Sequence, residues 1–490
     1  MPLPPLSTTS ASEWSYIAEG GANLVCSFNG AADSPYTGHA LRLRKRKGQR
    51  VETSKEDEVP SEVNGEFASK VIEPLLGKER LPETEVVVVE RDWLEALGKK
   101  LEEDGVRPPE RVEEDEVDVD AHEVVVVEDL IGGGGVLAVE IKPKWGFLPS
   151  PVALSRSTRD LKTTYCRFCM HRFSKRFPSA SSPPSSDDLS AFLAEHNEGF
   201  CPLDLHRRTF SRCVESLERL CETWSQSEGE GNNLRFFLDG KKLLPTEPAD
   251  FDRLYITLRP LKSTTFLADQ SPPRSLPFTF SHAIVDNLCT SPTLVTLRHL
   301  QHTLDCLDIE GLAALLREDD RAGVDLSSAE PDLARLGQQP TTGEWASFVE
   351  RYDHLLNPPT PGNSFTQRED LAAELVTANP RDAVLAYLLS ATFKDCSLIL
   401  RIPLPSSSSA SSSSSSSFSP SVPAEPTLKV IDLDPKPLSR LGKYWRMDQS
   451  IVRRWGEMLD GLSEDERAKV RVCGDGEMKV WRGGDVDDTE

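Results

Sequence analysis

The sequence predicts an α+β fold in which an antiparallel sheet near the N-terminus precedes a larger, mostly helical region. Three observations predict it. Short strand patterns separated by turns occupy the first 45 residues, two buried strand patterns follow near residues 123 to 142, and apolar residues recur at helical spacing through the second half. At 490 residues the chain exceeds one ordinary hydrophobic core, so we expect two or three domains or one large two-lobed unit with insertions.

The N-terminal elements follow from their local patterns. Residues 1–12 are expected to be disordered. The predicted strands are 14–16, 24–28 and 40–43, the first two joined by Glu19-Gly20-Gly21-Ala22-Asn23, and then 123–129 and 136–142, joined by Gly132 to Gly135. The predicted helices are 63–75 and 92–102, whose apolar residues recur every three or four positions.

The second half is expected to be helical around a few strands. The predicted helices are 189–195, 208–224, 293–317, 367–376 and 380–389, and the predicted strands are 234–238, 398–402 and 427–433. A Ser/Pro-rich stretch at 177–188 and a region at 404–424 that contains the serine tract 406–417 are expected to be disordered insertions, because they cannot bury enough apolar surface to offset ordering entropy. We therefore expect an N-terminal lobe at 13–160, a C-terminal lobe at 161–482 and an acidic tail at 483–490.

Composition limits the classes of partner. The chain carries 56 Lys and Arg against 79 Asp and Glu, a formal net charge of −23. Long-range repulsion from this charge opposes binding to nucleic acid and to anionic membranes, so a site for a polyanion must be a local basic pocket. No signal-peptide pattern precedes residue 13 and no apolar run reaches 18 residues, so we expect a soluble intracellular protein without membrane partners.

Lysines beside a strand indicate where a polyanion could bind. Lys142 and Lys144 follow an apolar strand pattern, and alternate residues of an extended strand share a face. Two ammonium groups side by side suit phosphate, although a solvated strand end is the alternative interpretation. The turn containing Gly20 and Gly21 could likewise bring backbone N–H groups close to phosphate, or be a plain hairpin turn.

Carboxylates occur where two later strand patterns begin and end. Asp395 precedes strand 398–402 and Asp432 lies in strand 427–433. Phosphoryl transfer needs oxygen ligands for Mg²⁺ and often a carboxylate that accepts the hydroxyl proton. A glycine hairpin, a basic strand at Arg42, a strand ending at Asp129 and later Asp-bearing strands follow the order of parts in phosphoryl transferases that resemble protein kinases. Either aspartate alone could instead be a structural turn residue.

Further polar residues could contact phosphates. Lys436, Arg440 and Tyr444 are spaced i, i+4, i+8, which predicts one face of a helix beginning after Pro437, with a solvated basic stripe as the alternative. Asn232, Asn233 and Arg235 offer amide and guanidinium donors at the start of a strand, or a turn.

The ten cysteines are expected to be reduced thiols. Cys166 and Cys169 have the spacing of a zinc finger, and zinc could be held by this pair, Cys201 and one histidine. Because no second paired motif follows, buried thiols are the favoured interpretation and zinc the alternative.

With these residues identified, the chain resembles the inositol-pentakisphosphate 2-kinase family over nearly its full length. The motifs that carry the resemblance are Glu19-Gly20-Gly21-Ala22-Asn23-Leu24-Val25, Pro74-Leu75-Leu76-Gly77, Glu140-Ile141-Lys142-Pro143-Lys144-Trp145-Gly146-Phe147-Leu148-Pro149, Cys166-Arg167-Phe168-Cys169-Met170-His171 with Lys175, Cys201-Pro202-Leu203-Asp204-Leu205, Asn232-Asn233-Leu234-Arg235, Lys394-Asp395-Cys396-Ser397 and Asp432-Leu433-Asp434-Pro435-Lys436.

The resemblance implies a two-lobed inositol phosphate kinase fold distantly like protein kinases. We expect a monomer that is located in the nucleus, the cytoplasm or both. The implied reaction is ATP-dependent phosphorylation, with Mg²⁺, of the 2-hydroxyl of inositol 1,3,4,5,6-pentakisphosphate to inositol hexakisphosphate (phytate). The alternative is a non-catalytic scaffold protein that binds inositol phosphates. Such a protein would keep the lysines but lose Asp395, Asp432 or the glycine turn, and all of these are present.

The resemblance also implies residue roles. Lys142 and Asp395 are the implied catalytic residues, Asp432 and Asp395 the metal ligands, and Gly20, Gly21, Asn23, Arg42, Asp129 and Glu140 the nucleotide contacts. The implied inositol phosphate contacts are Lys144, Lys175, Asn232, Asn233, Arg235, Lys436, Arg440 and Tyr444. A family arginine of the N-terminal lobe falls at Arg107 or Arg111, and His206 stands where the family has phenylalanine. The zinc pattern of plant members is absent.

Overall fold

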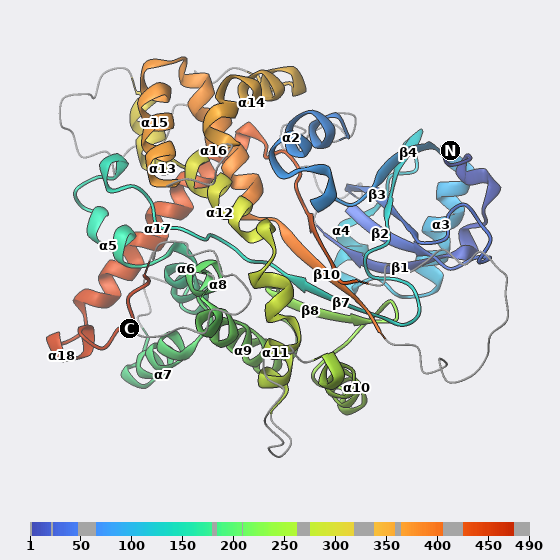
Figure 1. The fold of residues 1–490 in the computed structure, drawn as a ribbon, viewed down its shortest axis with the longest axis horizontal. Coiled ribbons are helices and arrows are strands. Elements are labelled where there is room, and N and C mark those ends of the chain that lie inside the picture. The colour runs from blue at the N-terminus through green and yellow to red at the C-terminus, as the bar shows by residue number, and fades with distance from the viewer. Residues whose placement is uncertain are drawn as a thin grey trace.

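The computed structural model describes residues 2–20, 23–47, 65–178, 184–207, 209–261, 275–317, 338–357, 364–404 and 425–474. In these residues, helices combine with two antiparallel sheets, which confirms the predicted α+β class (Figure 1).

The first sheet forms near the N-terminus, as predicted. Its strand order is β1-β2-β3-β6-β4, and β5 also pairs with β3. The bounds are β1 (Trp14–Glu19), β2 (Asn23–Phe28), β3 (His39–Lys47), β4 (Thr84–Val88), β5 (Asp115–Val117) and β6 (Glu123–Glu128). Strands β4 and β5 were not predicted. In β4, Val86 and Val88 are exposed at the sheet edge, so its valines do not follow the usual rule of apolar residues inside.

One face of this sheet is covered by helix α3 (Arg91–Glu103) and by the first residues of the chain. The expected disorder of residues 1–12 is wrong for the described residues 2–12. Leu6 is fully buried in the core of the first sheet, and the Tyr36 hydroxyl donates a hydrogen bond to the Pro4 carbonyl. The apolar contact made by Leu6 explains why this short Pro-rich segment is ordered.

A glycine connector leads from the first sheet to the second. Strand β6 belongs to the first sheet and β7 (Val136–Ile141) to the second, so residues 129–135 cross between them. Gly133 and Gly135 have φ values of 97° and 73°, in the left-handed region that favours glycine. Asp129 closes the turn, because its Oδ1 accepts hydrogen bonds from the backbone N–H of Ile131 (3.0 Å) and Gly132 (2.6 Å).

The second sheet has the order β11-β10-β7-β8-β9. Besides β7, its strands are β8 (Leu234–Leu238), β9 (Lys241–Lys242), β10 (Ser397–Pro403) and β11 (Thr427–Ile431). Strands β7, β8, β10 and β11 were predicted from their apolar runs. Residues far apart in sequence are therefore neighbours, since β7 pairs with β10 through Ile141 opposite Leu398.

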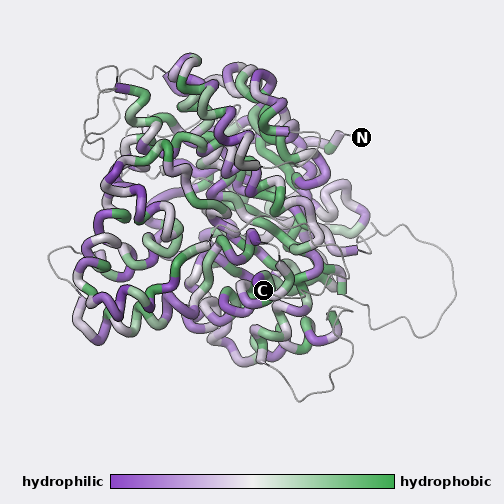
Figure 2. Tube along the Cα trace, turned by 60° about the vertical axis from the view of Figure 1, so that its left-hand side comes forward, coloured by the Kyte–Doolittle hydropathy of each residue, from purple (hydrophilic) through white to green (hydrophobic). Residues whose placement is uncertain are grey.

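Helices enclose the second sheet and form most of the remaining chain (Figure 1). Their bounds are α2 (Glu73–Leu76), α4 (Pro109–Glu114), α5 (Arg159–Thr164), α6 (Arg167–Arg176), α7 (Ser186–Glu198), α8 (Pro202–Arg207), α9 (Phe210–Gln226), α10 (Pro248–Leu258), α11 (Leu276–Cys289), α12 (Pro292–Leu304), α13 (Asp308–Leu315), α14 (Thr342–Leu356), α15 (Ser364–Thr377), α16 (Pro380–Lys394), α17 (Leu441–Asp460) and α18 (Glu464–Arg467). Hydrophobic segments concentrate toward the middle of the molecule in Figure 2, while hydrophilic ones are frequent on outer turns.

The helix predictions agree in place but several differ in extent; the predicted helix 63–75, for example, includes a π-helical turn (Ala68–Ile72) before α2. Helices α5, α6, α8, α10, α11 and α14 were not predicted. The predicted helix 293–317 divides into α12 and α13, because Asp308 has a φ of 55°. Helix α7 begins at Ser186, so the expected insertion 177–188 is too long at its C-terminal end. Residues 179–183, the insertion 405–424 and the acidic tail lie outside the described residues. No helix in the described ranges has the length and apolarity needed to cross a bilayer.

Candidate active site

The candidate catalytic residues meet at one end of the second sheet. In an antiparallel sheet the end of one strand lies beside the start of its neighbour. The end of β7 therefore lies beside the starts of β8 and β10, and Ser397 at the start of β10 pairs with Ile431 at the end of β11. The residues that precede or follow these strand ends, including Lys142, Asp395 and Asp432, are brought together although they span 290 residues of sequence.

Lys142 is bound to two carboxylates at this end. Its Nζ lies 3.1 Å from Asp432 Oδ2 and 3.8 Å from Glu140 Oε1. Ser397 Oγ links the same two groups, at 2.9 Å from Asp432 and 3.1 Å from Glu140. Glu140 is buried and also accepts a hydrogen bond from Arg235 Nη1 at 3.2 Å. The three polar side chains that surround Glu140 and Asp432 thus hold these two carboxylates in one arrangement.

Two further lysines contact Asp395. Lys436 Nζ lies 3.1 Å from Asp395 Oδ2, and Lys144 Nζ lies 3.9 Å from Asp395 Oδ1. The Asp395 side chain is 63% exposed, whereas Lys144 and Lys436 are 18% and 13% exposed. An exposed carboxylate is therefore paired with two partly buried ammonium groups.

Lys142 and Lys144 converge, but not by the strand alternation that we expected. Strand β7 ends at Ile141, and Lys144 has a φ of 59°, so the backbone has turned before it reaches Lys144. The adjacent Gly146 permits this turn to pack closely, because a Cβ there would lie 2.5 Å from Cγ of His206. The turn, rather than an extended strand, brings both lysines to the same site.

The environments of the two lysines shift their pKa values in opposite directions. Burial by itself lowers the pKa of Lys142, but the charges of Asp432 and Glu140 outweigh it and raise that pKa above its ordinary value. For Lys144, burial and the nearby Lys142 and Lys175 charges hold the pKa below its ordinary value despite the attraction of Asp395. Burial raises the pKa of Asp432, yet Lys142 and the Ser397 hydroxyl bring it below its ordinary value, so this carboxyl is ionised at neutral pH.

Arg42 joins the first sheet to this end of the second. It lies on β3, and its Nη2 is 2.5 Å from Asp434 Oδ2, just after β11. In the amide orientation that satisfies its neighbours, Asn23 Oδ1 accepts hydrogen bonds from Arg42 Nη2 at 2.8 Å and Nε at 3.3 Å. Two of the predicted nucleotide contacts, Asn23 and Arg42, are therefore in direct contact.

The other predicted nucleotide contacts differ in environment. Gly20 closes the β1–β2 hairpin with a hydrogen bond from its N–H to the Asn23 carbonyl at 2.8 Å, and Gly21 lies outside the described residues. Asp129 is buried, and the Ser27 hydroxyl occupies its second oxygen, Oδ2. Its carboxylate thus holds the connector between the sheets through both of its oxygens.

The predicted inositol phosphate contacts surround the site to different degrees. Asn233 lies beside Lys142, with its Nδ2 3.2 Å from the Lys142 carbonyl, while Asn232 next to it is exposed. Lys175 is exposed on α6 and lies close enough to Lys144 to depress its pKa. Arg440 is exposed, and Tyr444 is half-buried near Tyr387.

The predicted single helix face for Lys436, Arg440 and Tyr444 is wrong. Helix α17 begins at Leu441, so only Tyr444 lies on it; Arg440 belongs to a 3₁₀ turn (Leu438–Arg440) and Lys436 precedes it. Pro437 explains the difference, since it disfavours helical backbone at Lys436 and lacks an N–H.

The two arginines considered for the N-terminal lobe have separate environments. Arg107 is buried, with its Nη2 2.8 Å from Glu19 and 2.6 Å from Asp115, and Lys45 contacts the same two carboxylates. Arg111 pairs with Glu114 at 3.3 Å on the surface of α4. Arg107 thus belongs to a buried ion network that holds the end of β1.

Sequence reasoning left three residues of the site without a role. Asp434 pairs with Arg42, and Ser397 connects Glu140 to Asp432. Burial, with the charges of Arg167, Lys175 and Lys144, lowers the pKa of His171 to about 4, so this neutral imidazole lies among the cations. All three lie inside motifs that the sequence shows, but only their spatial neighbours distinguish them from the rest of each motif.

Known proteins resemble this chain over most of its length. The family model for inositol-pentakisphosphate 2-kinases matches residues 16–450. The chain belongs to the inositol-pentakisphosphate 2-kinase family. It is 30% identical over 461 residues to an inositol-pentakisphosphate 2-kinase of Cryptococcus neoformans, covering 92% of this chain and 95% of that protein. Proteins of the same name from Arabidopsis thaliana (28% identical, 91% of this chain and 94% of that protein) and Oryza sativa (27%, 95% and 98%) are also similar.

As a member of the inositol-pentakisphosphate 2-kinase family, the chain is an enzyme that transfers a phosphoryl group to an inositol phosphate. The matched segment includes the first sheet from Tyr16 onward, the second sheet and the start of α17, and therefore every candidate residue described above.

Proposed function

We propose that the protein uses ATP and Mg²⁺ to phosphorylate the 2-hydroxyl of inositol 1,3,4,5,6-pentakisphosphate, giving inositol hexakisphosphate. The observation that carries the proposal is the convergence of Lys142, Lys144 and Lys436 with Asp395 and Asp432 at one end of the second sheet. Five phosphate groups bring a charge of roughly −8 to −10 at neutral pH. A chain with a net charge of −23 needs such a local cluster of cations to bind them.

The two sheets form the two lobes of a kinase-like enzyme in this proposal. The β1–β2 hairpin, with Gly20, Gly21 and Asn23, would cover the ATP phosphates, and Arg42 would contact them from β3. Because Arg42 reaches Asp434, the nucleotide phosphates would lie where the first sheet approaches the end of β11. Asp129 would act indirectly, by holding the connector beside which the nucleotide binds.

Binding of the inositol phosphate would use the remaining cations and amides. Lys144, Lys436, Lys175, Arg235 and Arg440 would pair with phosphates, and Asn232, Asn233 and Tyr444 would donate hydrogen bonds. Each charge-assisted contact contributes roughly 1.5 to 3 kcal/mol. Contacts with the phosphates that do not react can hold one hydroxyl in line with the γ-phosphorus, the proximity effect on which phosphoryl transfer depends.

The carboxylates have the chemistry that the metal requires. Asp432 is 48% exposed with a lowered pKa, and Asp395 is 63% exposed, so both offer solvent-accessible oxygens of the hard type that Mg²⁺ prefers. When bound there, Mg²⁺ would neutralise phosphate charge.

The transfer step uses residues of this chain. Asp395 would accept a hydrogen bond from the 2-hydroxyl and take its proton as the hydroxyl oxygen bonds to the γ-phosphorus of ATP. The bond from that phosphorus to the bridging oxygen breaks, and ADP leaves. Lys142, which is held protonated by Asp432 and Glu140, would stabilise charge on the transferring group.

Product identification tests the proposal. Purified protein is incubated with inositol 1,3,4,5,6-pentakisphosphate and Mg-ATP, and products are resolved by anion-exchange chromatography and ³¹P NMR. We expect one new phosphate on the 2-position and one ADP per hexakisphosphate. A pentakisphosphate whose free hydroxyl is at another position is the matched control and should react far more slowly. Formation of no hexakisphosphate across a range of Mg²⁺ concentrations would overturn the proposal.

A further inference from the structure

One glutamine of α12 contacts both segments that carry candidate active-site residues. Gln301 is fully buried. Its Oε1 accepts a hydrogen bond from the Gly146 N–H at 2.9 Å, and its Nε2 donates to the Lys144 carbonyl at 3.1 Å and to the Phe393 carbonyl at 2.9 Å. Gly146 belongs to the turn after β7, and Phe393 lies two residues before Asp395. The amide therefore joins the segment of Lys144 to the segment of Asp395.

The three partners call for a primary amide. The Gly146 N–H can only donate and the two carbonyls can only accept, so one side chain must present one acceptor and two donors. A glutamine does so without adding a charge beside the Lys144 ammonium group. The same partners fix the orientation of the amide, with Oε1 toward Gly146 and Nε2 toward the carbonyls.

The turn after β7 needs support because of the backbone conformation of Lys144. Its φ of 59° lies in a region that residues with a Cβ rarely adopt. Such a conformation persists only where the surrounding structure holds it. Gln301 holds the Lys144 carbonyl and the Gly146 N–H, and Arg298, three residues earlier on α12, donates from Nε to the Gly146 carbonyl at 2.8 Å. Contacts from α12 thus fix the backbone on both sides of Trp145.

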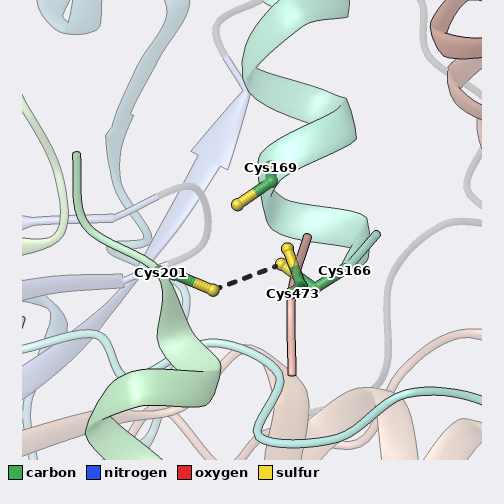
Figure 3. Close-up of side chains that lie close together, drawn as sticks. All are labelled: Cys166, Cys169, Cys201 and Cys473. Carbon is green, nitrogen blue, oxygen red and sulfur yellow. Dashed lines mark hydrogen bonds between the residues drawn. The ribbon is translucent and has the colours of Figure 1, made fainter. Parts of the chain in front are cut away.

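Helices α6 and α8 also contact this turn. The Cζ of Arg167 on α6 lies 5.2 Å from the centroid of the Trp145 ring, and His206 of α8 packs closely against Gly146. The starts of these two helices meet at a cluster of four buried cysteines whose Sγ atoms all lie within 4.8 Å of one another (Figure 3): Cys166, Cys169, Cys201 and Cys473. The sequence suggested a histidine as the fourth member, and the structure has Cys473 there. The turn therefore packs against helices that are joined to each other.

At the second segment, Gln301 satisfies a carbonyl near the end of a helix. The last four carbonyls of an α-helix have no partner within it, and Phe393 is the next-to-last residue of α16. The two segments also touch directly, because the Lys394 ammonium group lies 4.2 Å from the centroid of the Trp145 ring. Gln301 adds directional hydrogen bonds to this contact and so sets the spacing of the two segments.

We propose that Gln301 is a positioning residue that holds Lys144 and Asp395 in the arrangement that binds the inositol phosphate. The proposal rests on the proposed function, in which Lys144 pairs with a phosphate. Without the amide, the turn relaxes in the free protein, and binding of the ligand has to restore it. The cost of holding such a backbone conformation corresponds to a weakening of binding of about 5- to 150-fold.

Two variants test the amide. Gln301→Met removes all three hydrogen bonds, and Gln301→Glu keeps an acceptor for the Gly146 N–H but lacks the two donors. Isothermal titration calorimetry should show that each raises the Kd for inositol 1,3,4,5,6-pentakisphosphate by about 5- to 150-fold. The Kd for a non-hydrolysable ATP analogue should stay at the wild-type value, because Asn23 and Arg42 lie on the first sheet.

Thr303→Val is the matched control for a buried polar change on the same helix. Thr303 is fully buried on α12, and its Oγ1 lies 3.4 Å from Nδ1 of His299, on the same helix. This variant should keep the wild-type Kd for the pentakisphosphate.

Kinetics separates positioning from a loss of folded protein. A variant that is only less stable contains less active enzyme, so its apparent kcat falls while both KM values stay at wild type. A positioning role raises the KM for the inositol phosphate and leaves the KM for ATP unchanged. Circular dichroism verifies folding, and Gln301→Glu carries the test if Gln301→Met does not fold. Failure of both variants to fold would make Gln301 a purely structural residue and overturn the proposal.

A double variant tests whether Gln301 acts through Lys144. In a Lys144→Met background, Gln301→Met should raise the Kd for the pentakisphosphate by less than about 2-fold. A full effect in that background would contradict the proposal, as would a wild-type Kd in both single variants or an equal loss of affinity for the ATP analogue. Wild-type protein that binds the pentakisphosphate but forms no hexakisphosphate would instead contradict the proposed function, and the binding test of Gln301 would still apply.

Discussion

Arg42 and Asp434 are 392 positions apart in sequence, yet Arg42 Nη2 lies 2.5 Å from Asp434 Oδ2 and so joins strand β3 of the first sheet to the residues after β11 of the second. Their side chains are 29% and 36% exposed, so the pair contributes only about 0 to 1 kcal/mol to stability. The pair matters for the position of Arg42 rather than for stability. It holds the guanidinium at the junction of the two sheets, where we propose that the nucleotide phosphates bind.

Replacement of Arg42 should therefore weaken nucleotide binding more than stability. Arg42→Met removes a charge-assisted contact of about 1.5 to 3 kcal/mol, so we expect the KM for ATP to rise about 10- to 150-fold. Asp434→Asn should raise it less, because Arg42 remains. Steady-state kinetics with varied ATP measures both effects. Arg46→Met is the control, since Arg46 on the same strand pairs with Glu116 and Asp120, and an equal rise in that variant would contradict the assignment.

Asp395 and Lys142 should be needed for turnover and not for folding. We expect Asp395→Ala and Lys142→Ala each to reduce kcat about 100- to 10,000-fold, the range for loss of a proton acceptor or of a group that stabilises developing charge. Because Asp395 is largely exposed, its replacement should leave the thermal midpoint close to wild type. Asp460→Ala, at an exposed ion pair with Arg467, is the control and should keep full activity. A near-normal kcat in either active-site variant would remove that residue from the mechanism.

Arg107 should stabilise the folded protein. Arg107→Met leaves Glu19 and Asp115 with only Lys45 in a buried site, where loss of one partner costs about 3 to 5 kcal/mol. Urea denaturation should detect this loss, whereas Arg111→Met at the surface should change stability by less than about 0.5 kcal/mol. Equal stability of the two variants would show that the Arg107 network does not stabilise the first sheet.

His206 should make the protein sensitive to acid. Burial and the nearby Arg298 charge lower the pKa of His206 from 6.5 to about 3. Between these values the unfolded state binds the proton and the folded state does not, so stability falls as the pH falls below 6.5. The loss between pH 7 and pH 5 amounts to about 2 kcal/mol for this buried group.

His206→Phe should remove that part of the pH dependence. Urea denaturation at pH 7 and pH 5 should show a smaller loss for the variant than for the wild type. His354→Gln, at an exposed histidine on α14, is the control and should retain the wild-type dependence. If His206→Phe and wild type lose the same stability over this range, the ring does not stay neutral in the folded protein.

The local patterns of the sequence were sufficient for most strands and for part of the helices. Strand β2 and helices α3 and α9 were found because apolar periodicity within a single element reports which of its faces is buried. Patterns failed where contacts from elsewhere decide the conformation. The segment around Leu6 is ordered only because that side chain enters the core of the first sheet, and β4 forms because β6 offers a partner.

The sequence by itself determined the α+β class, most strands, part of the helices, and the motifs that contain Lys142, Asp395 and Asp432. Only the tertiary structure decided which residues meet: Arg42 with Asp434, Ser397 between Glu140 and Asp432, Arg107 inside an ion network, and Cys473 beside Cys166, Cys169 and Cys201. The reason is physical. A residue's own neighbours in sequence bias its backbone and the face it buries, whereas contacts between atoms hundreds of residues apart depend on how the completed sheets and helices pack together.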